Sequence, residues 1–230
     1  MATAIAEIIK EAMIYIDDVR LQEQLSTNPA LFYRRLNDYV SAAMPLLSSP
    51  PELLSHIEGK FVPADFDSYT WVSTAESTTQ ETEVGTGCIG FDLCSVVTVY
   101  DQGLTTPYTD FEYDSETGIV TFAEQNTADV EYEIDFYKDG SVADLTYTQK
   151  RLFGLAIAIV WNERFVNNWL NIQPKVKDSS FQTVNESNLM DKMTLRMIAM
   201  RQEFQDEMRK YEQNNAYRNV NKPYTQWGLM

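Results

Sequence analysis

The stretch from Leu152 to Trp161 is apolar nearly all the way round a helix, and it limits the folds open to this chain more than any other feature. Helical texture begins near Tyr147, and Pro174 marks the end of the segment. A helix with this pattern must be covered on several sides. The sequence therefore predicts a central buried helix with other elements packed around it.

Two amphipathic helices are predicted in the first 60 residues. Apolar residues recur on one face of the range Ile5–Val19, which predicts the first helix. Asn28 as the cap and Pro29 at the first helical position begin the second helix, which runs until Pro45. Glu52–Ile57 suggests one further short turn. Two helices alone are too small to bury both apolar stripes.

The last predicted helix carries a methionine-rich stripe. Thr183 and Glu186 have the spacing of a capping box at its start. Apolar residues then follow in steps of three and four, so they share one face of the helix. Many of them are methionines, whose flexible side chains adapt to the surface that they pack against. They are Leu189, Met193, Met197, Met200, Phe204, Met208 and Tyr211.

Beyond about Gln213 the sequence predicts an extended arm. Asn214 and Asn215 discourage a continuing helix, and Pro223 blocks one. We interpret the large and basic side chains of this segment as anchors for a partner surface, since a free polar tail would not need them. They are Tyr217, Arg218, Lys222, Tyr224, Trp227 and Leu229. The alternative is a tail that folds back on its own domain.

The region from Phe61 to about residue 145 is typical of β-structure. Val96–Tyr100 predicts one strand and Tyr108–Tyr113 a second. The residues Asp114–Gly118 have the length and glycine placement of a hairpin loop that leads into Ile119–Phe122.

A further strand is predicted where apolar and acidic residues alternate. The apolar residues are Val130, Tyr132, Ile134 and Phe136, and the acidic ones are Glu131, Glu133 and Asp135. This alternation predicts one buried face and one wet face. The polar run from Thr74 to Gly87 offers little to a core and predicts an extended loop or arm.

The predicted fold class is therefore α+β, with a helical bundle core of about four main helices, an inserted β-rich module and an extended C-terminal arm. We expect the N-terminal helical part at 1–60 and the acidic insertion at 61–145. The C-terminal helical part follows at 146–215, and the docking arm at 216–230.

The net charge of −16 is concentrated in the middle of the chain. Residues 61–145 hold 18 acidic side chains and one basic one, Lys138, for a charge of −17, whereas residues 146–230 hold 8 acidic and 12 basic ones, for +4. The negative electrostatic field of residues 61–145 repels nucleic acid. We therefore expect this region to be a surface that DNA passes without binding, or one that mimics DNA. A solvated β-surface kept soluble by its carboxylates is the plainer alternative.

No catalytic apparatus is recognisable, and we expect no enzyme activity, no cofactor and no metal. His56 is the only histidine, so it cannot build a multi-histidine metal site and is expected to be structural or exposed. Phosphate-binding glycine loops are missing. Asp139 is read as a turn residue, and Asp114 and Glu116 as a solvated hairpin tip.

The two cysteines, Cys88 and Cys94, are expected to be small core residues without a disulfide between them, because a regular strand would hold them too far apart. Charges interrupt the apolar N-terminus, and no stretch reaches the length of a membrane span. We therefore expect a protein made in a reducing cytoplasm, with no membrane partner.

Three stretches carry a resemblance to a known family: the opening helices at 3–57, the segment Phe181–Leu189 that leads into a charged helix, and the closing Tyr217–Val220. The sequence of the predicted hairpin, Tyr113–Phe122, is similar to β-modules of virion proteins. Taken in this order, the elements resemble the head-to-tail connector (neck or adaptor) proteins of tailed bacteriophages.

This resemblance implies a structural protein of the virion neck, made in the host cytoplasm. It implies a homo-oligomeric ring, commonly a dodecamer, beneath the portal, with helices around a channel through which DNA passes without specific binding. The portal protein and a downstream neck or tail protein would be its partners. Two other functions stay open: an acidic DNA-mimic or inhibitor protein that uses the carboxylates of 110–135, and a tail-completion or baseplate subunit.

Overall fold

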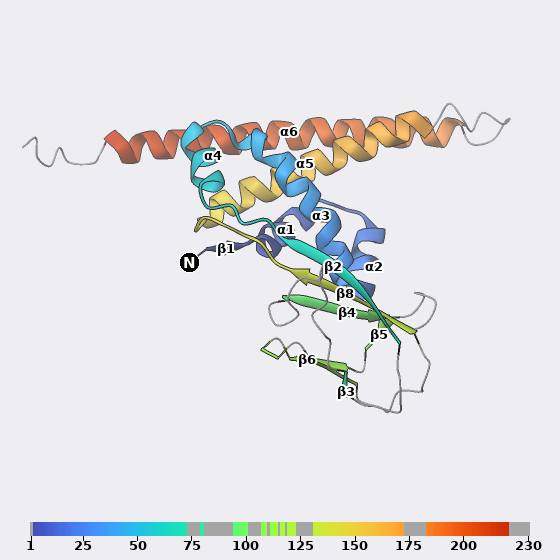
Figure 1. The fold of residues 1–230 in the computed structure, drawn as a ribbon. Coiled ribbons are helices and arrows are strands. Elements are labelled where there is room, and N and C mark those ends of the chain that lie inside the picture. The colour runs from blue at the N-terminus through green and yellow to red at the C-terminus, as the bar shows by residue number, and fades with distance from the viewer. Residues whose placement is uncertain are drawn as a thin grey trace, which may run out of the picture.

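The computed structural model describes residues 2–72, 79–80, 94–100, 107–109, 111–114, 116–117, 119–122, 131–172 and 183–220. These residues form an α+β fold, as predicted. Helices lie in layers on one side of the molecule, and antiparallel strands lie on the other (Figure 1). The helical segments are α1 (Ile5–Met13), α2 (Val19–Thr27), α3 (Pro29–Ala43), the 3-10 turn η1 (Met44–Leu47), α4 (Pro51–Glu58), α5 (Tyr147–Ile172) and α6 (Thr183–Val220).

The helical layers are stacked on α5. Helix α6 lies on one side of α5, and α1 and α3 lie on the other side (Figure 1). The prediction of a central buried helix is confirmed, because every residue from Leu152 to Ile159 is buried. Gly154 allows α1 to approach closely, since a Cβ atom there would lie 2.8 Å from the backbone nitrogen of Ala12.

The strands form three antiparallel groups. A four-stranded sheet has the order β2-β8-β4-β5, a three-stranded sheet has the order β3-β7-β6, and β1 pairs with β9. Their bounds are β1 (Thr3–Ala4), β2 (Asp65–Val72), β3 (Thr79–Gln80), β4 (Val96–Tyr100), β5 (Pro107–Tyr108), β6 (Phe111–Asp114), β7 (Ile119–Phe122), β8 (Glu131–Lys138) and β9 (Ser141–Val142).

The second N-terminal helix begins as predicted. Asn28 caps α3 by accepting a hydrogen bond of 2.9 Å from the Leu31 amide, and Pro29 takes the first helical position. The Asn28 side chain also donates to the Asp135 carboxylate at 2.9 Å, which joins the start of α3 to strand β8.

The prediction of one wet face on β8 is wrong for its C-terminal half. Tyr132, Ile134 and Phe136 are buried as predicted, but Asp135 and Tyr137 on the opposite face are only 7% and 1% exposed. The reason is that α3 packs across this face of the sheet. The C-terminal half of β8 is therefore buried on both faces, although its sequence alternates like that of a strand with one solvent-exposed face.

The first predicted helix is also shorter than expected. It ends at Met13, and a second helix, α2, begins at Val19. Asp18 caps α2 by accepting a 2.8 Å hydrogen bond from the Arg20 amide. Ile16 is 1% exposed, whereas Val19 is 73% exposed and does not belong to the buried stripe.

The predicted hairpin between Asp114 and Ile119 is confirmed, because these two residues pair across β6 and β7. The single strand predicted over Tyr108–Tyr113 is not: Tyr108 belongs to β5 and pairs with β4, whereas Phe111 begins β6 in the other sheet. The chain thus changes sheets between these residues.

Two apolar clusters hold the fold together. The larger unites the helices and also includes Tyr137, Val142 and Leu145 from the end of the β-rich region. The smaller lies between the two larger sheets and contains Cys94, which is buried as predicted. Cys88 and most of the Thr74–Gly87 run lie outside the described residues.

Candidate functional site

The structure describes the first two predicted arm residues. Helix α6 continues through Val220, so Tyr217 and Arg218 have helical backbone, and the predicted helix end near Gln213 is wrong. Asparagine disfavours a helix interior by less than about 1 kcal/mol per residue, a preference too weak to end so long a helix. The other predicted anchors, Lys222, Tyr224, Trp227 and Leu229, lie outside the described residues.

Helix α6 is attached to α5 by the predicted methionine-rich stripe. Met200, Phe204 and Met208 are buried. Polar contacts flank the stripe: Arg151 pairs with Glu203 at 3.2 Å, and Gln149 donates to the Tyr211 hydroxyl at 2.8 Å.

The C-terminal end of α6 projects from the molecule. The Ser49 hydroxyl donates to the Glu212 carboxylate at 2.6 Å, which ties α6 to the turn before α4. Beyond Glu212 the helix runs on to Val220, past the rest of the helical layers (Figure 1). A short helix end without tertiary packing is only marginally stable in water. Its helical backbone is continuous with the part of α6 that packs on α5.

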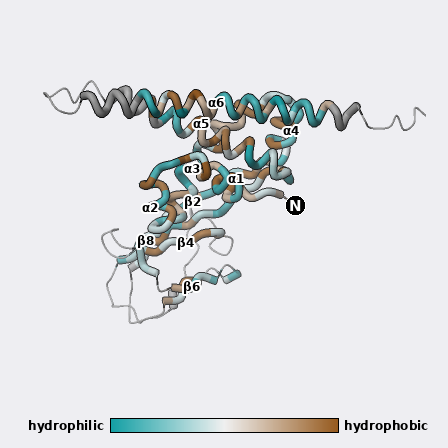
Figure 2. Tube along the Cα trace, turned by 180° about the vertical axis from the view of Figure 1, so that it is seen from behind, coloured by the Kyte–Doolittle hydropathy of each residue, from teal (hydrophilic) through white to brown (hydrophobic). Residues whose placement is uncertain are grey.

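The outward side of α6 is mostly polar, and its C-terminal half is hydrophilic (Figure 2). Leu195 and Ile198 interrupt it, with 65% and 45% of their surfaces exposed. Because they are three residues apart, they are neighbours on one helix face.

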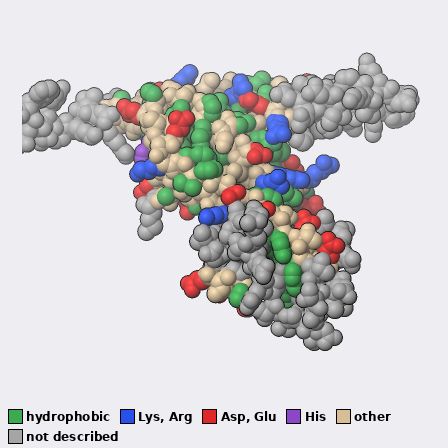
Figure 3. All heavy atoms as spheres, in the orientation of Figure 1, with side chains coloured by type: hydrophobic (Ala, Val, Ile, Leu, Met, Phe, Trp, Pro, Cys, Tyr) green, Lys and Arg blue, Asp and Glu red, His purple; other side chains and the backbone are tan. Residues whose placement is uncertain are grey.

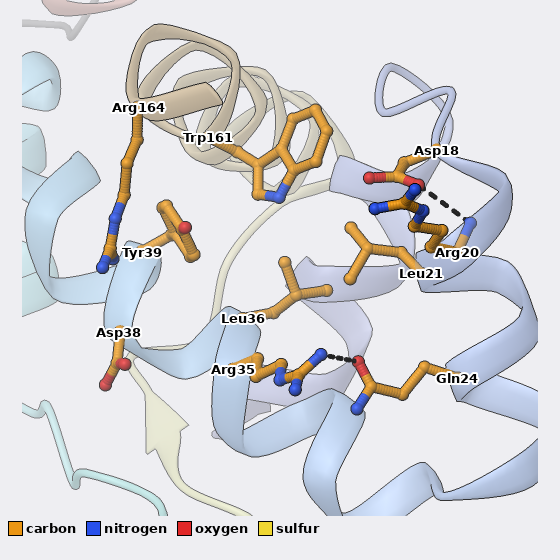
Figure 4. A pocket seen from close by; sticks show the side chains of 10 residues that line it. All are labelled: Asp18, Arg20, Leu21, Gln24, Arg35, Leu36, Asp38, Tyr39, Trp161 and Arg164. Atoms are coloured by element: carbon orange, nitrogen blue, oxygen red, sulfur yellow. Dashed lines mark hydrogen bonds between the residues drawn. The ribbon is translucent and has the colours of Figure 1, made fainter. Parts of the chain in front are cut away.

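A cleft of about 370 Å³ opens between α2, α3 and α5 (Figure 4). The buried side chains of Leu21 and Leu36 form its apolar part, and Trp161 points toward them. Around them lie polar residues from all three helices and the turn before α2. The polar lining residues are Asp18, Arg20, Gln24, Arg35, Asp38, Tyr39 and Arg164.

The three arginines of this cleft supply its positive charge and its guanidinium hydrogen-bond donors. Arg35 donates a 2.8 Å hydrogen bond to the Gln24 amide oxygen, and the guanidinium of Arg164 lies 5.4 Å from the centre of the Tyr39 ring. Within the described ranges, none of Arg20, Arg35 and Arg164 forms an ion pair. Guanidinium groups that lack a carboxylate partner suit a carboxylate or a phosphate.

Sequence reasoning missed this cleft because its arginines come from three helices, and no local motif links them. The Lys and Arg side chains visible in Figure 3 lie on and around the helical layers. In the described part of the β-rich region, Lys138 is the single basic residue. The described β-rich region is thus almost without basic side chains, whereas the helical layers carry both signs of charge.

Asp139, predicted as a turn residue, has a structural role. Both of its carboxylate oxygens accept a hydrogen bond from the Ala6 amide at 3.2 Å, and one accepts from the Tyr137 hydroxyl at 3.1 Å. Burial raises the pKa of Asp139, and the hydrogen bonds from Ala6 and Tyr137 oppose that rise. Burial and the nearby Asp139 raise the pKa of Tyr137 and of Tyr33, which stacks on it. This cluster anchors α1 to the sheet.

The single histidine lies at the surface of the molecule. The ring nitrogen Nε2 of His56 is exposed and lies 3.4 Å from the Asp144 carbonyl oxygen. In the part of the chain that the structure covers, no three His, Cys, Asp or Glu side chains cluster as metal ligands would. None of the helices within these ranges is both long and apolar enough to cross a membrane.

No protein-family model, no curated protein and no solved structure matches this chain.

Proposed function

We propose that this protein is a head-to-tail connector subunit of a tailed bacteriophage virion. In this proposal, copies form a ring, with twelve-fold symmetry, beneath the portal. The helical layers act as a bundle around the DNA channel, and the chain end after Val220 acts as an arm on the portal. The subunit works through its surfaces, without catalysis, cofactor or metal.

The observation that carries the proposal is the projecting end of α6. Between Glu212 and Val220 the helix leaves its own body, and it leads into a segment with Tyr224 and Trp227. Aromatic anchors at the tip of a projecting element are typical of segments that dock on another protein. Order in such a segment costs about 1 to 2 kcal/mol per residue in backbone entropy, which burial of the aromatic side chains on a partner can offset.

Charge separation supports assembly around DNA. The acidic middle of the chain would repel DNA phosphates, so this part of each subunit would not hold the DNA that passes through the ring. The positive charge of residues 146–230 is complementary to that middle, so neighbouring copies can meet head to tail. The exposed pair Leu195 and Ile198 adds an apolar contact on the outside of α6.

Truncation after Asn215 tests the docking role. The buried stripe of α6 and the Ser49–Glu212 hydrogen bond remain in the shortened chain, so its melting temperature should match that of the full chain. Binding to portal rings should be lost, and Trp227→Ala should lose part of it. The measurements are thermal melting and co-sedimentation with the portal protein encoded in the same genome.

Tyr147→Ala is the control for the truncation, because Tyr147 is also a large exposed side chain but lies on α5. It should leave docking unchanged. A truncated chain that docks as well as the full one would refute the arm hypothesis. Electron microscopy of the complex should show a ring; a subunit that stays monomeric or dimeric and instead inhibits a DNA-binding enzyme would favour the DNA-mimic function.

A further inference from the structure

The arginine cleft between α2, α3 and α5 has two properties of a binding site for an acidic element. It combines an apolar part, formed by Leu21 and Leu36, with the guanidinium groups of Arg20, Arg35 and Arg164. Among the residues the structure covers, no carboxylate of this chain pairs with those groups. Asp18 and Asp38 also line the cleft, so its arginines exceed its carboxylates by one. An element that brings carboxylates can pair with guanidinium groups that have no carboxylate partner in the isolated subunit.

A suitable element lies on the same chain at the opposite side of the fold. The hairpin formed by β6 and β7, which we call the acidic hairpin, lies at the end of the β-rich region farthest from the helical layers (Figure 1). It exposes the carboxylates of Glu112, Asp114 and Glu116, and the sequence from 110 to 124 contains no Lys or Arg.

The tip of the acidic hairpin is held in shape by its own hydrogen bonds. The Asp114 carboxylate accepts from the Glu116 amide at 2.9 Å and from the Thr117 hydroxyl at 2.7 Å. These hydrogen bonds hold the pKa of Asp114 below its usual value, so it stays charged. The exposed carboxylates of Glu112 and Glu116 are available to pair with basic side chains of another molecule.

We propose that the arginine cleft of one subunit receives the acidic hairpin of the next copy. The contact joins two different surfaces, so it propagates from copy to copy and closes into a ring when the rotation fits. This inference rests on the ring of the proposed function and names the contact that would build it. A nucleic-acid phosphate would offer the same kind of anionic group, and the experiment below distinguishes the two occupants.

A charge exchange tests the contact. The cleft variant carries Arg35→Glu with Arg164→Glu, and the hairpin variant carries Glu112→Lys with Glu116→Lys, while Asp114 is kept because it shapes the tip. Each variant alone sets like charges against each other, so its self-association constant should fall about 100-fold. Mixed in equal amounts, the two should recover assembly, because in an alternating ring every cleft meets a hairpin of opposite charge.

The control variant, Lys10→Glu with Lys60→Glu, changes the net charge by the same amount as the cleft variant at two exposed positions outside the cleft. It should assemble like the wild type. Assembly is measured by sedimentation velocity, alone and with portal rings, and thermal melting confirms that each variant is folded. Higher salt should weaken the wild-type contact. The Debye length is about 8 Å at physiological ionic strength, and added salt shortens it further, which screens the attraction between arginines and carboxylates.

The outcomes separate this inference from the proposed function. If the wild type forms rings on the portal and the cleft variant does so equally well, the cleft inference is wrong and the connector function stands. If the wild type forms no ring, alone or on the portal, both are wrong. If the wild type instead binds short duplex DNA and only the cleft variant loses that binding, the occupant is phosphate, and the hairpin assignment is overturned.

Discussion

Asp139 is the residue whose role depends most on its surroundings. Its carboxylate accepts the Ala6 amide hydrogen bond at the start of α1, although 133 positions separate the two residues. Ala4, which precedes α1, has no side chain that could do this. A negative charge at this place also interacts favourably with the positive N-terminal end of the α1 dipole. Burial nevertheless disfavours the charge and raises the pKa.

The raised pKa of Asp139 predicts a pH dependence of stability. Its carboxyl takes up a proton more readily in the folded chain than in the unfolded one, where the pKa is near 3.8. The resulting stabilisation is complete below that value and is lost as the pH rises through the raised pKa. Relative to Asp139→Asn, the wild type should therefore lose unfolding free energy as the pH rises above 3.8 and through the raised pKa. Urea unfolding of both chains at several pH values measures this difference.

Asp114→Asn is the matched control, because hydrogen bonds lower the pKa of Asp114 instead of raising it. Its stabilisation is present above the unfolded pKa and is lost as the pH falls. The pH trend should therefore have the opposite sign, and a flat difference between Asp139→Asn and the wild type would contradict the role of burial.

Gly154 predicts a second effect at the scale of one residue. In Gly154→Ala the new Cβ atom would lie 2.8 Å from the Ala12 nitrogen and 2.8 Å from the Glu11 Cβ atom. Helix α1 would have to move away from α5, so the unfolding free energy should fall by about 1 to 3 kcal/mol. Gly59→Ala, whose nearest contact is the Ser55 carbonyl oxygen of its own helix end at 3.1 Å, should cost less. Equal losses in urea unfolding would contradict this account.

At the scale of elements, α6 buries one apolar stripe against the rest of the molecule, with polar contacts beside it. Exposed ion pairs such as Arg209–Asp206 add little stability, so the buried Phe204 should dominate the attachment. Phe204→Ala should destabilise the attachment of α6 by about 3 kcal/mol and make the helix more sensitive to protease. Leu195→Ala, on the outward side, should leave cleavage unchanged; equal sensitivity of both variants would show that the stripe does not hold α6.

Local signals predicted the elements whose limits depend on local hydrogen bonds. Asn28 and Pro29 fix the start of α3 within a few residues, so the sequence was enough there. The start of α2 had a usable signal as well, since Asp18 is a preferred cap residue, but the apolar spacing from Ile5 to Val19 suggested one continuous helix.

Features that depend on distant partners were not predictable. Asp135 alternates with apolar residues like a solvent-facing side chain, but α3 covers it, and Asn28, 107 positions away, donates a hydrogen bond to its carboxylate. The arginine cleft depends on how α2, α3 and α5 come together, and no spacing in the sequence encodes that. Tertiary contacts decided both.

At the scale of the whole molecule, the helical core and the β-rich region share residues. Tyr137, Val142 and Leu145 belong to the same apolar cluster as the helices. Deletion of 61–145 should therefore expose that cluster, and the remaining helices should lose their cooperative melting. Replacement of the acidic hairpin (Phe111–Phe122) alone by a short linker should leave the melting of the helical cluster in place. Circular dichroism with temperature distinguishes the two; a cooperative transition in the larger deletion would mean that the helices fold independently.

The pairing of β1 with β9 also affects how the chain can fold as it is synthesised. Thr3 pairs with Val142, and the Ile5 amide donates to the Gly140 carbonyl oxygen at 3.0 Å. At about 5 to 20 residues per second, the ribosome needs roughly ten seconds to add these partners. During that time the apolar face of α1 has neither its strand nor α5 to cover it. Helix α1 is made well before these partners, so it must dock late, and a chaperone that shields the nascent α1 would act in that interval.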